Sequence, residues 1–178
     1  MSRGFTLVEL LTVVTIILIL SGLVLGVSAF VQRKANIDRA KVQLELFNLK
    51  ITEYKNDAGG SLPTTTEEDV EARSGIIIYR MLYGDGIGAD GIAGTEDDGA
   101  LDGRPDEGAI VYLPDLDPNN NKQNMIDKKG GDLPVEVEDP WGNPWRFRND
   151  ADKKNPDFDL WSHGPDGENG TADDIKNW

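Results

Sequence analysis

The sequence predicts an α+β fold in which one long N-terminal helix packs on a small antiparallel sheet. First, no charged residue occurs from Leu10 to Val31, and a helix of that length spans roughly the 30 Å hydrocarbon core of a bilayer. Second, an apolar stripe of helical period continues beyond this run. Third, short segments of alternating polarity follow in the second half, separated by turns rich in Gly and Pro. A helix followed by short strands favours the α+β class.

The helix is expected to cover residues 5–58, with 5–31 in the membrane or in the core of a filament. Charged residues begin after Gln32, but apolar side chains still recur every three or four positions, as one face of a helix requires. A Gly59-Gly60 pair then supplies a stop signal. The stripe predicts burial of Ile37, Ala40, Leu44, Phe47, Ile51 and Tyr54 against a globular domain.

The globular domain is expected over residues 59–178. Thr66 or a neighbour is a suitable N-cap for a short helix over 67–73. The apolar run 75–83 fits either a buried strand or a short helix, because periodicity alone does not separate the two. The remaining pattern predicts strands over 109–113, 145–148 and 158–162, and a loop over 163–178.

Composition excludes some classes of function. The chain has 32 acidic and 18 basic residues, a formal net charge of -14, and no cysteine. Strong negative charge argues against nucleic acid and against anionic lipid surfaces as partners of the soluble part. Without cysteines there is neither a disulfide framework nor a thiolate metal site. No nucleophile and base occur in a recognisable motif, so we expect a protein that is not an enzyme.

Glu9 is the one acid at the start of the apolar run. A carboxylate just inside a membrane is costly, and by default it marks a functional site that needs a partner. A buried carboxylate either protonates or pairs with a positive charge. The alternative is a simple membrane anchor with Glu9 at the level of the lipid headgroups.

The stretch Gly4-Phe5-Thr6-Leu7-Val8-Glu9 resembles the processing and assembly signal of type IV pilins and type II secretion pseudopilins. The resemblance implies a leader peptide over residues 1–4, cleavage by a prepilin peptidase after Gly4, and N-methylation of Phe5. It also implies that Glu9 pairs with the N-terminal amine of a neighbouring subunit in a helical filament.

The loop from Ser162 to Asp174 is rich in acidic residues and glycine. Calcium binds six to eight oxygens from carboxylates, carbonyls and water, and glycines let a backbone turn its carbonyls inward. A solvated acidic turn is the alternative. The surrounding pattern, from Asp139-Pro140-Trp141-Gly142-Asn143-Pro144 to Asn177-Trp178, resembles the C-terminal half of major pseudopilins.

That second resemblance implies a bound Ca²⁺ in a pilin-like fold. Carried onto this chain, the side-chain ligands are Asp166, Asp173 and Asp174, and the backbone carbonyls are those of His163 and Glu168. Ser162 is a further oxygen that could join them. An acidic insertion, about 84–132, departs from the family pattern. Within it, residues 88–98 match residues 164–174 in register. This match indicates a second calcium site on Asp90, Asp97 and Asp98, and a disordered acidic loop is the alternative.

The resemblance implies a structural subunit of a type II secretion pseudopilus that polymerises through its N-terminal helix and helps to drive protein export. Its partners would be copies of itself, the prepilin peptidase, other pseudopilins and the inner-membrane assembly platform. The expected location is the bacterial inner membrane, as a single-pass protein with a periplasmic globular domain, and then the periplasmic pseudopilus. A type IV pilin for adhesion, motility or DNA uptake is the alternative.

Overall fold

A computed structural model describes residues 6–88, 93, 98–127 and 136–178, with the backbone alone described at 23–29. The predicted leader 1–4, the cleavage pair Gly4 and Phe5, and two residues of the predicted second calcium site, Asp90 and Asp97, lie outside this part of the chain. Contacts divide the chain into two compact units, residues 1–36 and residues 37–178.

Helix α1 runs from Leu7 to Asp57, which confirms the predicted long helix within the described residues. It begins in a reciprocal capping arrangement. The Thr6 hydroxyl accepts a hydrogen bond from the Glu9 backbone N–H at 3.3 Å, and the Glu9 carboxylate accepts one from the Thr6 N–H at 2.8 Å. At the other end, Gly59 and Gly60 both adopt positive φ, and the Gly60 N–H donates to the Lys55 carbonyl at 2.7 Å, which closes the helix.

The N-terminal unit exposes apolar side chains along α1, from Leu7, 81% exposed, to Leu20, 57% exposed. Within the described part of the chain, no helix is both long enough and apolar enough to cross a bilayer. The predicted membrane segment, residues 5–31, overlaps positions 5 and 23–29, whose side chains are not described.

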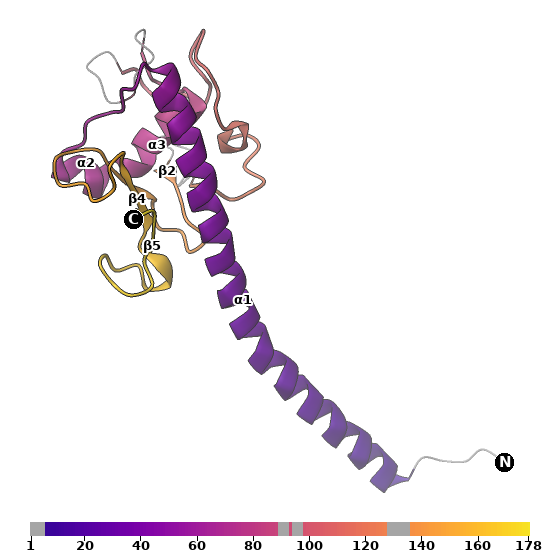
Figure 1. The fold of residues 1–178 in the computed structure, drawn as a ribbon. Helices are drawn as coiled ribbons and strands as arrows, with labels where there is room; N and C mark the ends of the chain where they lie inside the picture. The colour runs from indigo at the N-terminus through magenta and orange to yellow at the C-terminus, as the bar shows by residue number, and fades with distance from the viewer. Residues whose placement is uncertain (1–5, 89–92, 94–97, 128–135) are drawn as a thin grey trace. The chain divides into compact units, whose positions relative to one another are not determined.

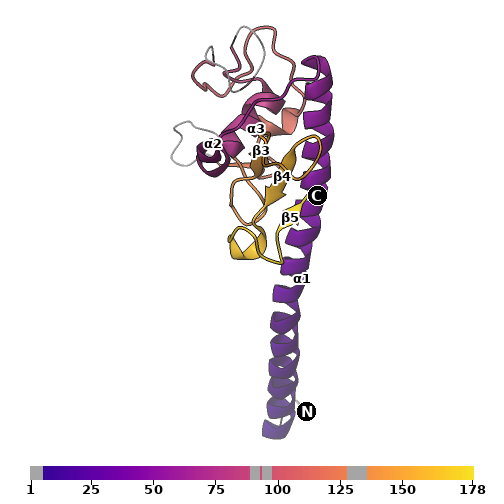
Figure 2. The same cartoon turned by 60° about the vertical axis from the view of Figure 1, so that its left-hand side comes forward.

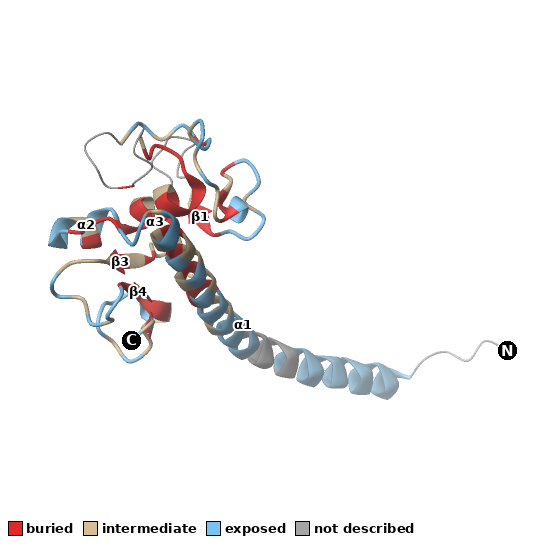
Figure 3. Cartoon of the chain, turned by 45° about the horizontal axis from the view of Figure 1, so that its top comes forward, coloured by how far each residue is buried: buried red, intermediate tan, exposed pale blue. Residues whose placement is uncertain are grey.

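The core of the 37–178 unit forms along the predicted stripe of α1. Ile37 is partly buried and packs against the core. The other five stripe residues are buried: Ala40, Leu44, Phe47, Ile51 and Tyr54. The opposite side of this part of α1 carries exposed residues, and Figure 3 shows the change from buried to exposed around the helix. The amphipathic period therefore identified the packed face correctly.

Two short helices follow α1. Helix α2, Glu67–Ala72, starts at the predicted cap, where the Thr66 hydroxyl accepts from the Asp69 N–H and the Asp69 carboxylate accepts from the Thr66 N–H. Helix α3, Ser74–Tyr83, settles the ambiguous apolar run as a helix, and eight of its ten residues are buried. It ends at Gly84 with φ 77°, where an added Cβ would lie 2.8 Å from the Ala109 Cβ.

The strands form two small antiparallel sheets. Strand β1, Ile126–Asp127, pairs with β2, Glu136–Val137. Strand β4, Asp159–Ser162, lies between β3, Arg146–Arg148, and β5, Ile175–Lys176. Figures 1 and 2 show β4 and β5 beside the loop that joins them, drawn in yellow.

Two predictions about the second half were wrong. Residues 109–113 are not a strand, because the N–H groups of Tyr112 and Leu113 both donate to the Leu82 carbonyl at the end of α3. The segment 163–178 is not all loop, since it contains the short 3₁₀ helix Gly164–Asp166 and strand β5.

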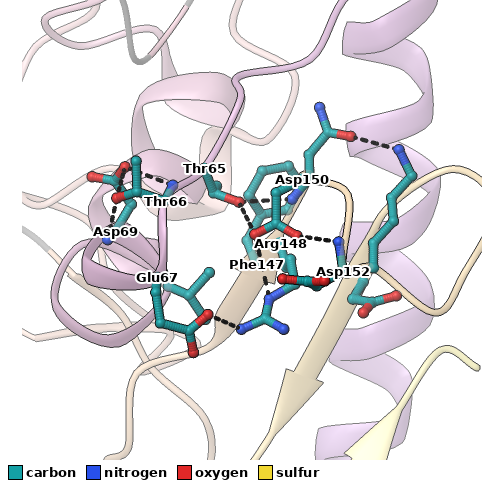
Figure 4. Close-up of polar contacts among 12 residues, drawn as sticks. Thr65, Thr66, Glu67, Asp69, Phe147, Arg148, Asp150 and Asp152 are labelled. Carbon is teal, nitrogen blue, oxygen red and sulfur yellow. Dashed lines mark hydrogen bonds and ion pairs between the residues drawn. The ribbon is translucent and has the colours of Figure 1, made fainter.

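Polar side chains join α2 to the end of β3 (Figure 4). Arg148 contacts the Glu67 carboxylate at 2.8 Å and the Asp150 carboxylate at 3.6 Å. The Thr65 hydroxyl accepts from the Asn149 N–H at 2.9 Å. The connection before α2 is therefore held to the strand by side chains.

Asn177, near the end of the chain, connects the sheet to α1. The Asn177 side chain donates to the Asn48 side-chain oxygen of α1 at 3.2 Å and to the Phe158 carbonyl at 3.1 Å. Its own oxygen accepts from the Leu160 N–H at 3.0 Å. One amide thus joins the sheet to a helix 129 residues earlier in the sequence.

Asp85 organises the described part of the acidic insertion. Its carboxylate is fully buried and accepts from the Tyr79 hydroxyl at 3.0 Å and from the N–H groups of Asp102 and Gly103 at 3.1 and 2.8 Å. Burial raises the pKa of Asp85, although these hydrogen bonds act in the opposite direction. The folded chain therefore holds a proton on Asp85 more tightly than the unfolded chain does.

The raised pKa predicts a pH dependence that Asp85→Asn should remove. Because the folded pKa exceeds the unfolded one, the stability that Asp85 contributes is largest below about pH 4 and falls as the pH rises to the folded pKa. Each unit of pKa difference removes about 1.4 kcal/mol. Denaturant unfolding of both proteins between pH 4 and 8 measures this, and a wild-type advantage over the variant that grows with pH would contradict it.

Candidate functional site

The loop that joins β4 to β5 contains all five residues predicted for the C-terminal calcium site. Three of its glycines have positive φ: Gly164 at 68°, Gly167 at 71° and Gly170 at 85°. At Gly164 an added Cβ would lie 2.3 Å from the Asp173 carbonyl oxygen, so only glycine fits there. The beginning and the end of the loop are therefore in direct backbone contact.

Two of the predicted ligands, Asp166 and Asp173, lie close together. One Asp166 oxygen accepts from the Glu168 N–H at 2.9 Å, and one Asp173 oxygen accepts from the Thr171 hydroxyl at 2.6 Å. The hydrogen bond from Thr171 lowers the pKa of Asp173, and the neighbouring Asp166 carboxyl contributes to the shift. Asp173 therefore favours the ionised form that a cation needs.

Asp174 combines burial with an unused oxygen. Its side chain is 3% exposed, and its Oδ2 accepts from the Gly170 N–H at 3.0 Å and lies 3.8 Å from Lys176 Nζ. Its Oδ1 is buried and has no hydrogen-bond partner among the described residues. A buried carboxylate oxygen without a partner is costly, and a bound cation would satisfy it.

The other predicted oxygens are placed less favourably. His163 is 7% exposed and is the N-cap residue of the 3₁₀ helix Gly164–Asp166, so its carbonyl already serves the first bond of that helix. The Glu168 carbonyl accepts from the Thr171 hydroxyl at 3.4 Å, and the Glu168 side chain is exposed. The Ser162 hydroxyl is already used, since it donates to Asp139 and accepts from the Gly164 N–H.

Within the described ranges, no three His, Asp or Glu side chains converge to hold a metal ion. The calcium ligands of the C-terminal loop therefore stay a prediction. The donor set still fits calcium, because calcium sites mix a few carboxylates with backbone carbonyls and water. The adjacent Asp166 and Asp173 and the unpartnered oxygen of Asp174 are the features that favour it.

The predicted second calcium site is described only at Asp98. Its carboxylate forms an ion pair with Arg80, whose guanidinium also donates to the carbonyls of Gly86 and Gly99, both at 3.0 Å. Arg80 therefore supplies positive charge at this end of the insertion. The site itself stays a prediction, because Asp90 and Asp97 lie outside the described residues.

Sequence reasoning missed the role of Asp139. This side chain is 2% exposed, and one oxygen accepts from the N–H groups of Trp141 and Asn143, both at 2.9 Å. The other oxygen accepts from the Ser162 hydroxyl at 2.6 Å. An Asp followed by Pro, Gly and Asn indicates a side-chain-capped turn, but no local signal reveals the bond to Ser162.

The second candidate site is the start of α1. Glu9 lies in the first turn, where its carboxylate accepts from both the N–H and the hydroxyl of Thr6, at 2.8 and 2.7 Å. The side chain is exposed in the isolated chain. It is therefore available to a positive charge supplied from outside the chain.

A capped apolar helix that continues into a small α+β domain defines the class of pilin-like proteins. Two family profiles match the chain. The prokaryotic N-terminal methylation motif matches residues 1–25, and the profile described as type II secretion system (T2SS), protein G, matches residues 113–178.

Individual relatives agree with these profiles. The type II secretion system core protein G of Escherichia coli (strain K12) is 30% identical over 99% of this chain and 90% of the relative. That of Pseudomonas aeruginosa is 31% identical over 98% of this chain and 94% of the relative. A crystal structure of the major pseudopilin of enterohaemorrhagic Escherichia coli has 23% identity and a TM-score of 0.45, over 82% of this chain and 85% of that chain. The chain belongs to the type II secretion system core protein G family, the major pseudopilins, which are structural and not enzymatic.

Proposed function

We propose that this protein polymerises through α1 into a type II secretion pseudopilus and so helps to drive protein export. The observation that carries the proposal is the exposure of apolar side chains along α1 from Leu7 to Leu20. Such a surface is not stable in water, and lipid or the helices of other copies would cover it. Family membership favours the pseudopilus over a surface pilus for adhesion, motility or DNA uptake.

Processing precedes assembly in this proposal. The match of residues 1–25 to the methylation motif supports cleavage by a prepilin peptidase after Gly4 and N-methylation of Phe5. The subunit would begin as a single-pass protein of the bacterial inner membrane, with residues 59–178 in the periplasm. Other pseudopilins and the inner-membrane assembly platform would then move it into the filament.

Glu9 provides the charge partner for assembly. Cleavage creates a positive amine at residue 5, and burial of that charge among helices needs a compensating carboxylate. The Glu9 carboxylate is exposed and is anchored by Thr6 in the first turn of α1. Glu9 of one subunit would therefore pair with the amine of its neighbour.

Glu9→Ala should leave cleavage intact and prevent efficient assembly. Removal of one partner of a buried pair costs about 3 kcal/mol, or about 100-fold in the association constant between subunits. Immunoblots of precursor and mature chain, with quantified sheared filaments, measure the two steps separately. Asp38→Ala is the matched control, because it removes one exposed negative charge from the same helix. Normal filament yield from Glu9→Ala would remove Glu9 from the mechanism.

Calcium would complete the C-terminal loop. Asp166, Asp173 and Asp174 would supply carboxylate oxygens, and His163 and Glu168 would supply carbonyls. The ion would neutralise the adjacent carboxylates and satisfy the buried Oδ1 of Asp174. Since an ion that binds only the folded state stabilises it, calcium would strengthen the closure of β5 onto β4.

A further inference from the structure

The turn that precedes β3 is tied to the proposed calcium loop by a chain of hydrogen bonds. Asp139 is almost fully buried at the start of this turn, and its Oδ1 accepts from two backbone N–H groups within it. Hydrogen bonds to an ionised acceptor are among the strongest in proteins, so the turn holds this carboxylate in a fixed position.

The second oxygen of Asp139 reaches out of the turn to β4. The Ser162 hydroxyl donates to it at 2.6 Å, and Ser162 itself is fully buried. This bond fixes the direction of the hydroxyl proton, so the remaining lone pairs of the Ser162 oxygen are free to accept. One of them accepts the Gly164 N–H at 3.0 Å. Asp139 therefore orients Ser162, and Ser162 holds Gly164.

Gly164 is the point where the loop closes on itself. Its Cα lies against the backbone carbonyl of Asp173, where no other residue type fits. A second side chain of the turn, Asn143, donates to the Gly164 carbonyl at 3.3 Å. The position of Gly164 therefore sets the position of the Asp173 backbone, and with it the positions of the Asp173 and Asp174 carboxylates.

We propose that Asp139 is a positioning residue for the C-terminal calcium site and acts through Ser162 and Gly164. The inference rests on the proposed calcium site. Asp139 acts as an acceptor within the protein, since one oxygen accepts from the turn and the other from Ser162. Partners that orient the ligands of a metal typically change its affinity by about 10- to 100-fold when they are replaced.

Asp139→Asn is the mild test, because the amide oxygen can still accept from the two N–H groups of the turn. The charge and the acceptor that faces Ser162 are lost. We expect calcium affinity to fall at least about tenfold. The measurement is isothermal titration of calcium chloride into the full mature chain in detergent micelles. Asp139→Asn and Ser162→Ala together should weaken binding no more than Ser162→Ala alone, because both act on Gly164 along one path.

Asp159→Asn is the matched control. Asp159 is also 2% exposed and also accepts from backbone N–H groups, but these belong to Lys154 and Asn155, which lie outside the calcium loop. It should lower thermal stability and leave calcium affinity within about twofold, since it lies outside the path. Equal losses of affinity from both variants would mean that Asp139 acts only through general stability, which would overturn the inference.

The experiment separates failure of the inference from failure of the calcium site. If the wild type binds calcium and Asp139→Asn binds it equally well, the positioning role is wrong and the site stands. If the wild type binds none, both are wrong. Should Asp139→Asn fail to fold, Ser162→Ala gives the decision, because the path requires it to lose affinity as well.

Discussion

Asp173→Ala with Asp174→Ala should abolish the rise in melting temperature that calcium produces. A ligand at 100 times its Kd stabilises the folded state by about 2.7 kcal/mol, which corresponds to roughly 5–10 °C for a chain of this size. The double variant loses the ionised carboxylate beside Asp166 and the buried oxygen that has no other partner. Thermal unfolding of the full chain with calcium and with a chelator measures the difference.

The control for this prediction removes the same charge elsewhere. Glu107 and Asp115 are exposed acids of the same unit and lie outside the C-terminal loop. Glu107→Ala with Asp115→Ala should keep the full response to calcium. A double loop variant that still gains stability from calcium would show that the ion binds at another place.

Phe47→Ala should cost about 3–5 kcal/mol of unfolding free energy, the largest single loss that we expect. Phe47 is fully buried, and its ring packs edge-on against Trp145 with 5.5 Å between the ring centroids. Alanine would leave a cavity between α1 and the residue that precedes β3, and it would also remove a favourable aromatic pair. Denaturant unfolding of the full chain in detergent gives the value.

Leu49→Ala is the companion to Phe47→Ala. Leu49 lies two positions further along the same helix, on the opposite face, and is 57% exposed. Its replacement should change the unfolding free energy by no more than about 0.5 kcal/mol. Similar losses at both positions would contradict the assignment of the apolar stripe as the core.

Strong periodic and capping signals predicted much of this fold. The stripe through Phe47 identified the buried face of α1, because its period repeats over several turns. The cap at Thr66 marked the start of α2, because capping is a local signal. Strand β5 was missed, since two residues are too few to show alternation. Residues 109–113 were predicted as a strand because they are apolar in a row, but the N–H groups of Tyr112 and Leu113 bond to the end of α3 and not to another strand.

The candidate site was predictable only in part. Acidic residues with intervening glycines marked the loop, and the structure brings Asp166 beside Asp173 and buries Asp174. The link from Asp139 to Ser162 joins residues 23 positions apart, so it depends on the tertiary fold and leaves no pattern in the sequence. Arg80, the ion-pair partner of Asp98, was hidden for the same reason.

The amide of Asn177, which contacts Asn48, has a consequence for the order of folding. The two residues are 129 positions apart, so the chain between them must lose conformational entropy before the contact can stabilise the fold. Contacts between such distant residues slow folding. Because a chain is made from its N-terminus, residue 48 is present long before residue 177, so the 37–178 unit stays incomplete until its last residues have been made. Until then β4 lacks its partner β5 and presents an unpaired edge, which is a site for association with other chains.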